Sequence, residues 1–170
     1  MTDAKRQIEA ILFVSEHPVS LSRLEGLVET VDRPQIRQYL AELGADYDSQ
    51  GRAFALQEIA GGYQLTTRPE CAETIAKLQK SRADHRLSTA ALETLAIVAY
   101  KQPIGRADIE SIRGVQSGPL LRALLDRALV RVVGREEALG RPVLYGTSER
   151  FLEILGLSSI RDLPRPEELK

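Results

Sequence analysis

Apolar residues recur at helical spacing in two stretches of this chain, and the second stretch repeats the first. Sliding the sequence along itself by 85 positions places Leu12 on Ile97 and Pro18 on Pro103 without a gap. Apolar positions, helix-capping residues and prolines stay in phase over roughly forty residues. The pattern predicts two copies of one small domain.

The first copy is predicted to begin with three helices. Asp3 is the expected N-cap of the first helix, which ends near Glu16, and Ser20 opens the second. Asp32, with Pro34 two residues later, starts the third, because proline is tolerated in the first helical turn. The third helix carries its apolar stripe at Ile36, Tyr39, Leu40, Leu43 and Tyr47.

A β hairpin is predicted after these helices. Residues 54–59 and 63–67 are short extended runs, joined through Ala60-Gly61-Gly62. Glycines supply the positive φ angles that a tight hairpin needs. A closing helix over 69–79 is expected to bury Cys71, Ile75 and Leu78.

The second copy follows the same plan, starting at the N-cap Ser88. Residues 106–112 form its second helix, which Gly114 ends, and Ser117-Gly118-Pro119 opens the third. Residues 130–133 and 143–145 are expected to pair before a closing helix. Its first helix is apolar on nearly every side and needs more than one neighbour to cover it. The residues concerned are Leu92, Leu95, Ala96, Ile97, Val98 and Ala99.

Three helices followed by a hairpin is the order of a winged helix, a variant of the helix-turn-helix. The sequence therefore predicts a mainly α protein with small β hairpins (α+β), made of two tandem winged-helix domains. The expected limits are 1–80 for the first domain, 81–87 for a charged linker, 88–157 for the second domain and 158–170 for a flexible tail.

Composition argues against several classes of function. Lys and Arg number 23 against 24 Asp and Glu, and this balance disfavours a nucleic-acid binder, whose affinity comes mostly from neutralised phosphates. Cys71 is the single cysteine, so no internal disulfide is expected. No signal segment or membrane-length apolar run occurs, and the expectation is a cytoplasmic protein.

The sequence offers no catalytic constellation. It has no nucleophile elbow, phosphate-binding loop or dinucleotide-binding fingerprint. His17 precedes a turn proline, and His85 lies in the charged linker. We therefore expect no enzyme activity and no catalytic, cofactor-binding or metal-binding residue.

DNA binding is the alternative that the fold keeps open, because the third helix of a winged helix commonly reads DNA. The outward positions of the two third helices mix acids and bases: Gln35, Arg37, Gln38, Glu42 and Asp46 in the first copy, and Arg122, Ala123, Asp126 and Arg127 in the second. The alternative function is a tandem winged-helix DNA-binding transcriptional regulator.

Several long motifs resemble one known family. They are EAILFVSEHPVSLSRL and EIAGGYQLTTRPE in the first half, and LSTAALETLAIVAYKQPIGRADIESIRGV, GRPVLYGT and FLEILGLSSIRDLP in the second. Together they resemble the segregation and condensation protein B (ScpB) family. The resemblance implies a non-enzymatic subunit of the bacterial chromosome-condensation complex that binds, as a homodimer, the kleisin subunit (segregation and condensation protein A). The kleisin in turn bridges the heads of the SMC ATPase.

The resemblance also directs where contacts are expected. Phe13 and Val14, which lie off the main apolar stripe, are expected to support dimerisation through the first domain. The kleisin is expected on the second domain, whose first helix has surplus apolar surface and whose wing has an edge. The expected kleisin contacts are Ile97, Tyr100, Ile104, Pro142 and Tyr145.

Overall fold

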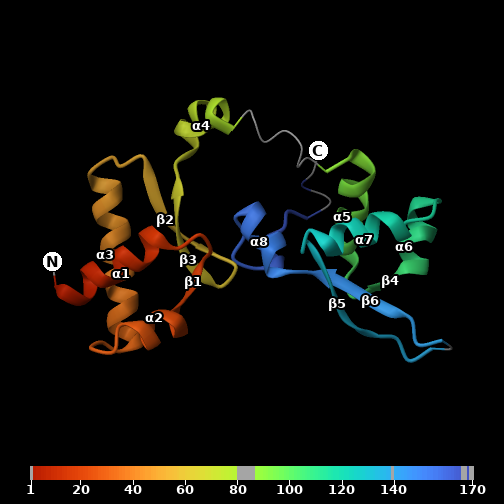
Figure 1. The fold of residues 1–170 in the computed structure, drawn as a ribbon, viewed down its shortest axis with the longest axis horizontal. Helices are drawn as coiled ribbons and strands as arrows, with labels where there is room; N and C mark the ends of the chain where they lie inside the picture. The colour runs from red at the N-terminus through yellow and green to blue at the C-terminus, as the bar shows by residue number, and fades with distance from the viewer. Residues whose placement is uncertain (1, 80–86, 139, 166–167, 169–170) are drawn as a thin grey trace. The chain divides into compact units, whose positions relative to one another are not determined.

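The computed structural model describes residues 2–79, 87–138, 140–165 and 168. They fall into two compact units, one of Met1–Ala83 with Gly156–Lys170 and one of Asp84–Leu155. All of the expected linker except Leu87 lies outside the described residues. Figure 1 follows the chain through the elements of each unit.

The first unit has the winged-helix order. Its elements are α1 (Asp3–Val14), β1 (Val19–Ser20), α2 (Leu21–Leu27), α3 (Arg33–Ser49), β2 (Phe54–Ile59), β3 (Gly62–Thr67), the 3-10 turn η1 (Pro69–Cys71) and α4 (Ala72–Gln79). The strands form an antiparallel sheet in the order β1-β3-β2. The hairpin is therefore the wing, and the short strand between the first two helices pairs with it.

Short polar side chains set the helix starts. Ser20 caps α2, and Asp32 caps α3 in a capping box with Gln35, both as predicted. The expected N-cap Asp3 is wrong by one residue, because the side chain of Thr2 accepts the Lys5 N–H instead. Either residue type can cap a helix, so the sequence alone does not separate neighbours.

The core of this unit lies where the three helices meet the sheet. The predicted stripe of α3 is confirmed, since Ile36, Leu40, Leu43 and Tyr47 are all buried. The Tyr47 ring meets the Phe54 ring edge-on with centroids 5.0 Å apart, which joins α3 to β2. The expected burial on the closing helix is wrong, because Cys71 and Ile75 are only half-buried and Leu78 is 84% exposed.

The hairpin turn is tighter than predicted. Only Ala60 and Gly61, with φ of 50° and 72°, make the turn, and Gly62 is already in β3. Gly62 is needed for a different reason, since a Cβ there would lie 2.9 Å from the carbonyl carbon of Val19 in β1. β1 can approach β3 this closely only because position 62 lacks a side chain.

The second unit repeats this architecture, which confirms the predicted fold class. Its elements are α5 (Thr89–Lys101), β4 (Ile104–Gly105), α6 (Arg106–Arg113), α7 (Gly118–Asp126), β5 (Val130–Arg135), β6 (Val143–Thr147) and α8 (Glu149–Leu155). Its sheet has the order β4-β6-β5. Ser88 caps α5, and Gly114 ends α6 with φ of 70°, both as predicted.

The internal repeat holds until the third helix. The starts of β4, α6 and α7 lie 85 positions after those of β1, α2 and α3. The register then ends, because α3 has 17 residues and α7 has 9. The first strands of the two wings, β2 and β5, are therefore not separated by 85 positions.

The residues after Leu155 are grouped with the first unit. The Leu157 carbonyl accepts the Ala60 N–H at 2.8 Å, and the Ser158 hydroxyl donates to the Glu58 carbonyl at 2.6 Å. A short 3-10 turn, η3 (Ile160–Asp162), follows. The start of the segment expected to be a flexible tail is thus hydrogen-bonded to the β2–β3 hairpin.

Candidate partner-binding surfaces

Two ionisable groups of the first unit with shifted pKa values, Lys5 and Glu42, belong to a structural ion-pair network. The Lys5 ammonium lies 2.9 Å from Asp46 Oδ2 and 3.1 Å from Glu42 Oε2, and the hydrogen bond to Asp46 is the main cause that raises the pKa of Lys5. Gln38, followed by Lys5, lowers the pKa of the Glu42 carboxyl. The network joins α1 to α3, and it engages the acidic side chains of Glu42 and Asp46 on the predicted recognition helix.

A second network orders the turn before α7. Glu110 Oε1 accepts the Ser117 backbone N–H at 2.8 Å and the Arg106 Nε–H at 2.8 Å. Both bonds lower the pKa of the Glu110 carboxyl, and the bond from Ser117 is the larger cause. Within the described residues, no group of three His, Cys, Asp or Glu side chains is placed to hold a metal ion. Over the same residues, no helix has both the length and the apolar character that crossing a membrane requires.

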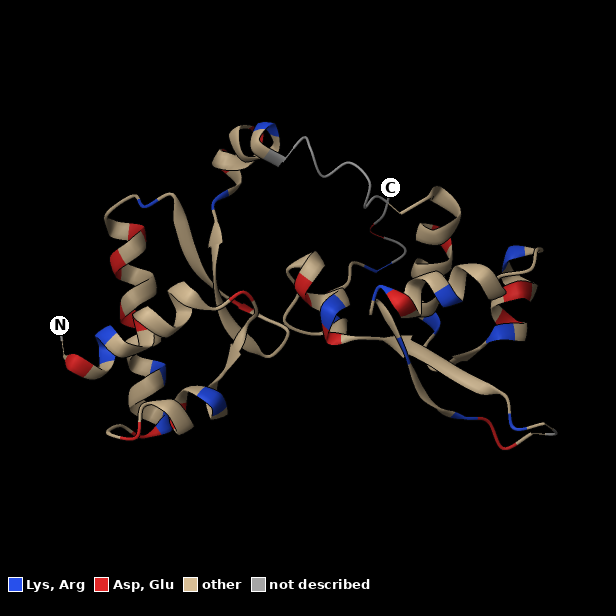
Figure 2. Ribbon diagram, viewed as in Figure 1, with Lys and Arg blue, Asp and Glu red and all other residues tan. Residues whose placement is uncertain are grey.

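The third helices do not present a basic surface. Arg122 and Asp126 are exposed on α7, as is Arg127 at its C-cap, and Glu42 and Asp46 lie on α3 beside Lys5. Figure 2 shows basic and acidic residues interspersed in both units. The charge that a DNA backbone would meet is therefore mixed, as the sequence predicted.

The five expected kleisin-contact residues differ widely in exposure. Ile104 and Tyr145 are directly opposite each other in the β4–β6 pairing, but Ile104 is only 6% exposed. Ile97 and Tyr145 are half-buried, whereas Tyr100 at 38% and Pro142 are exposed. Tyr100 and Pro142 thus offer the most accessible surface of the set.

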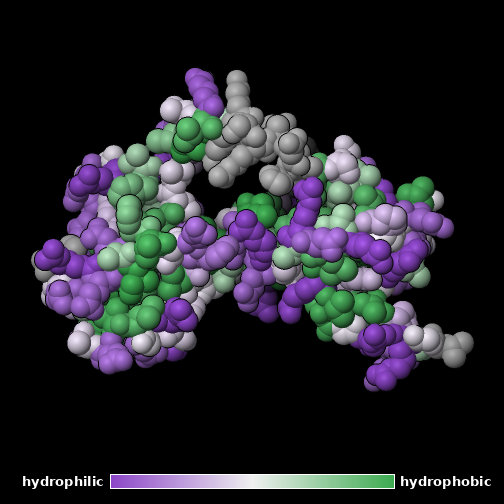
Figure 3. Space-filling view, in the orientation of Figure 1, coloured by the Kyte–Doolittle hydropathy of each residue, from purple (hydrophilic) through white to green (hydrophobic). Residues whose placement is uncertain are grey.

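Phe13 and Val14 lie at the end of α1 with almost all of their side-chain surface in solvent. Their exposed fractions are 84% and 77%. Figure 3 shows hydrophobic residues reaching the surface of both units between hydrophilic ones. Two adjacent large apolar side chains with this exposure form a patch that this unit's own core does not cover.

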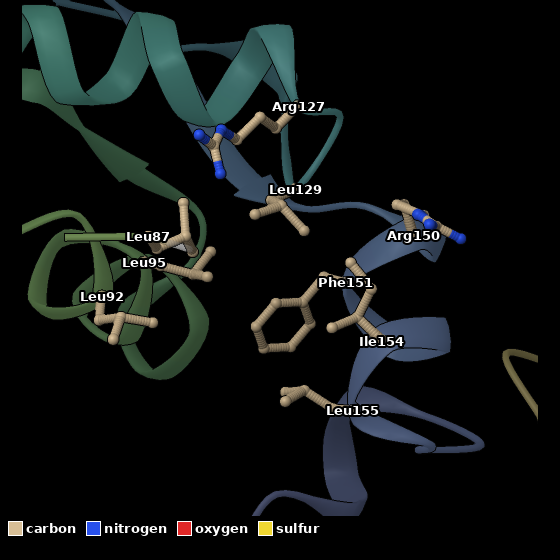
Figure 4. A pocket seen from close by; sticks show the side chains of 9 residues that line it. All are labelled: Leu87, Leu92, Leu95, Arg127, Leu129, Arg150, Phe151, Ile154 and Leu155. Carbon is tan, nitrogen blue, oxygen red and sulfur yellow. The ribbon is translucent and has the colours of Figure 1, made fainter. Parts of the chain in front are cut away.

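The second unit also has an apolar hollow, which we name the α5–α8 groove. It measures about 390 Å³ and is lined by Leu87, Leu92, Leu95, Arg127, Leu129, Arg150, Phe151, Ile154 and Leu155. In Figure 4, Leu87, Leu92 and Leu95 face the apolar side chains of α8, and the side chains of Arg127 and Arg150 point away from each other. Leu95, Leu129 and Phe151 are buried and form the floor.

The walls of the α5–α8 groove carry the most exposed of its apolar residues. Leu92 on α5 is 52% exposed, and Ile154 and Leu155 on α8 are 58% and 50% exposed. The sequence signal for one wall was the surplus apolar surface of the first helix, which includes Leu92. The opposite wall was missed because α8 lies some 60 positions later, and nothing local indicates that it faces α5.

Sequence comparison identifies the relatives of this chain. The sequence model of the family described as "Segregation and condensation complex subunit ScpB" matches residues 6–166. Segregation and condensation protein B of Syntrophotalea carbinolica is 51% identical over 166 residues, which cover 98% of this chain and 83% of that protein. The same-named protein of Symbiobacterium thermophilum is 44% identical, covering 96% of this chain and 74% of its own.

Two solved structures also align with the chain. The crystal structure of ScpB from Mycobacterium tuberculosis shares 35% identity, covers 92% of this chain and 99% of its own, and superposes with a TM-score of 0.44. A dimer of an ScpB N-terminal domain complexed with an ScpA peptide shares 31% identity, covers 44% and 85%, and has a TM-score of 0.41. Family membership follows from the shared sequence and not from these superpositions.

The element order of each unit defines a tandem winged-helix protein whose exposed surface is mixed in charge and apolar in places. The sequence matches span nearly the whole chain and narrow this class of protein to one family. The chain belongs to the family of segregation and condensation complex subunit ScpB, as the resemblance of its motifs predicted.

Proposed function

We propose that this chain is a non-enzymatic accessory subunit of a bacterial SMC–kleisin complex, which binds the kleisin as a homodimer and supports chromosome condensation and segregation. The family match over residues 6–166 carries the proposal, because that family is described as a complex subunit. The proposal places the protein in the cytoplasm, associated with the nucleoid through the complex. ATP chemistry belongs to the SMC partner, and no cofactor is assigned to this subunit.

Exposed apolar surface supports a role in assembly. Phe13 and Val14 suit a two-fold contact in the first unit, since an isologous interface uses the same patch twice. Leu92, Ile154 and Leu155 leave further apolar surface in the second unit. Apolar surface of this kind is the usual core of a protein–protein interface.

Binding to the kleisin of the same organism tests this function directly. The two purified full-length proteins are mixed and followed by size-exclusion chromatography with light scattering. A common peak with the mass of two copies of this chain plus kleisin is expected. Separate elution at micromolar concentrations of both proteins would contradict the function.

The sequence-based kleisin contacts, Ile97, Tyr100, Ile104, Pro142 and Tyr145, are part of this proposal. Tyr100→Glu is the informative variant, because Tyr100 is accessible whereas a charge at the buried Ile104 would disturb the core. The change is expected to weaken kleisin binding about tenfold and to leave the dimer intact. Unchanged affinity with a folded protein would remove Tyr100 from the contact.

DNA-binding regulation is the second candidate, favoured by the winged-helix topology and by the exposed Arg122 on α7 and Arg127 at its C-cap. The mixed charge argues against it. Affinity for duplex DNA is expected to be no better than about 10⁻⁴ to 10⁻⁶ M at physiological salt, which is the non-specific range. A sequence-dependent gel shift at nanomolar protein would reverse the order of the two functions.

A further inference from the structure

The segment that follows Leu155 docks on the end of the β2–β3 hairpin. The Leu157 carbonyl accepts the Ala60 N–H at 2.8 Å, and the Ser158 hydroxyl donates to the Glu58 carbonyl at 2.6 Å. β2 lies at an edge of its sheet, so one side of it faces no other strand of the described residues. An edge strand leaves backbone groups without a strand partner, and the docked segment supplies partners at the end of this one.

The docked segment also has a local structure of its own. Gly156 has φ of 65°, which lets the chain turn directly after α8. Ser159 and Asp162 form a capping box that starts η3, in which the Ser159 N–H donates to Asp162 Oδ2 at 2.7 Å. These local contacts shape the segment for docking, because they do not use the hairpin.

The core of the first unit is built without this segment. Its buried cluster runs from Ala4 to Tyr47, and the half-buried residues packed against the cluster end at Leu65. Release of the segment would therefore uncover the end of the hairpin and leave this core in place. Ser158 is exposed, and a segment held by a few exposed hydrogen bonds opens without global unfolding.

We propose that residues 156–163 are a reversible latch on the β2–β3 hairpin. In sequence, the second unit, Asp84–Leu155, lies between the two parts of the first. A closed latch therefore ties both ends of the second unit to the first unit, and an open latch leaves only one end tied. The latch goes beyond the proposed function and does not depend on it.

Hydrogen exchange of single amides, followed by NMR on the full-length chain, tests the latch. Shortening the chain after Leu155 removes the acceptor of the Ala60 N–H, and exchange at Ala60 is expected to become at least about tenfold faster. The amides of Leu40 and Leu43, which are buried in α3, are expected to stay within about twofold of the parent. Shortening the chain after Pro164 is the matched control, because it keeps both hydrogen bonds and should leave exchange at Ala60 unchanged.

Point variants test the latch without removing any residue. Ser158→Ala deletes the hydroxyl that donates to the Glu58 carbonyl and is expected to speed exchange at Ala60 several-fold. Arg161→Ala changes an exposed side chain of the same segment and should leave exchange at Ala60 as it is. Circular dichroism establishes that each variant keeps the fold.

Three results would overturn the latch. Equal exchange at Ala60 in the parent and in the chain shortened after Leu155 would show that the segment does not hold the hairpin. Acceleration of Leu40 and Leu43 by the same factor as Ala60 would make the segment a permanent part of the fold. A lower mass of the shortened chain in light scattering would assign the segment to a contact between copies. Kleisin binding does not enter these measurements, so the proposed function is tested separately.

Discussion

The side-chain oxygen Oε1 of Gln102 accepts two hydrogen bonds from Thr147, one from its backbone N–H at 2.7 Å and one from its hydroxyl at 3.1 Å. Gln102 is the C-cap of α5, and Thr147 is the last residue of β6. Gly146 makes room for this contact, because a Cβ there would lie 2.8 Å from the same oxygen. The pair therefore joins the first helix of the second unit to its wing.

Gln102→Ala should destabilise the second unit. Thr147 is 8% exposed, so its N–H would lose a partner in a place that water reaches poorly. Leaving a buried polar group unpaired costs about 1–3 kcal/mol. Urea unfolding followed by circular dichroism measures the change. Gln116→Ala, at an exposed position between α6 and α7, is the control and should stay within about 0.5 kcal/mol of the parent. Equal midpoints for both variants would show that the contact contributes nothing.

Two glycine-to-alanine changes in the first unit should act in opposite directions. Gly62→Ala places a methyl group 2.9 Å from backbone atoms of Val19 that cannot move freely, and should cost about 1–3 kcal/mol. Gly26→Ala, inside α2 with open space around the new methyl group, should stabilise by about 0.5–1 kcal/mol. Thermal unfolding compares the two. Equal effects would mean that β1 does not approach β3 as described.

Phe13→Glu combined with Val14→Glu should weaken the proposed homodimer. Burying each apolar side chain fully is worth about 1.5–3 kcal/mol, so the dissociation constant should rise more than tenfold. Light scattering over a micromolar dilution series measures the mass. Leu78→Glu is a control of equal exposure in the same unit. A double variant that stays dimeric at every concentration would place the interface elsewhere.

Glu110→Gln should change how stability depends on pH. The folded-state pKa of Glu110 is lowered, first by the Ser117 N–H and then by Arg106. Its contribution is therefore present above the unfolded-state pKa, about 4.3, and is lost as pH falls through the folded-state value. The parent should exceed the variant in melting temperature at pH 7, and the gap should narrow toward pH 3. Equal gaps at pH 7 and pH 3 would contradict this contribution of Glu110.

The 85-residue repeat was enough to predict the starts of α2, α3, α5, α6 and α7, because capping and apolar spacing are local signals. Asp32 and Ser88 show this, since their side chains cap the helices that they were predicted to open. β1 and β4 were not predicted. Each has two residues, too few for any periodicity, and each is a strand only because the wing pairs with it.

The candidate surfaces could be predicted only in part. The sequence indicated that the first helix of the second unit had more apolar surface than its neighbours would cover, and Leu92 is half-exposed. It could not indicate that Ile104 would be buried opposite Tyr145, since that depends on strand register. The α5–α8 groove depends in the same way on packing between helices that are distant in sequence.

The hydrogen bonds between the β2–β3 hairpin and the residues after Leu155 can form only after the second unit has been synthesised. Ser158 follows its acceptor residue Glu58 by 100 positions. At the usual pace of translation, about 5–20 residues per second, roughly 5–20 seconds separate the synthesis of the two. The hairpin turn must persist through that interval without its final partner, while all of the second unit is being made. The first unit thus gains these hydrogen bonds only after the residues of the second unit have been made.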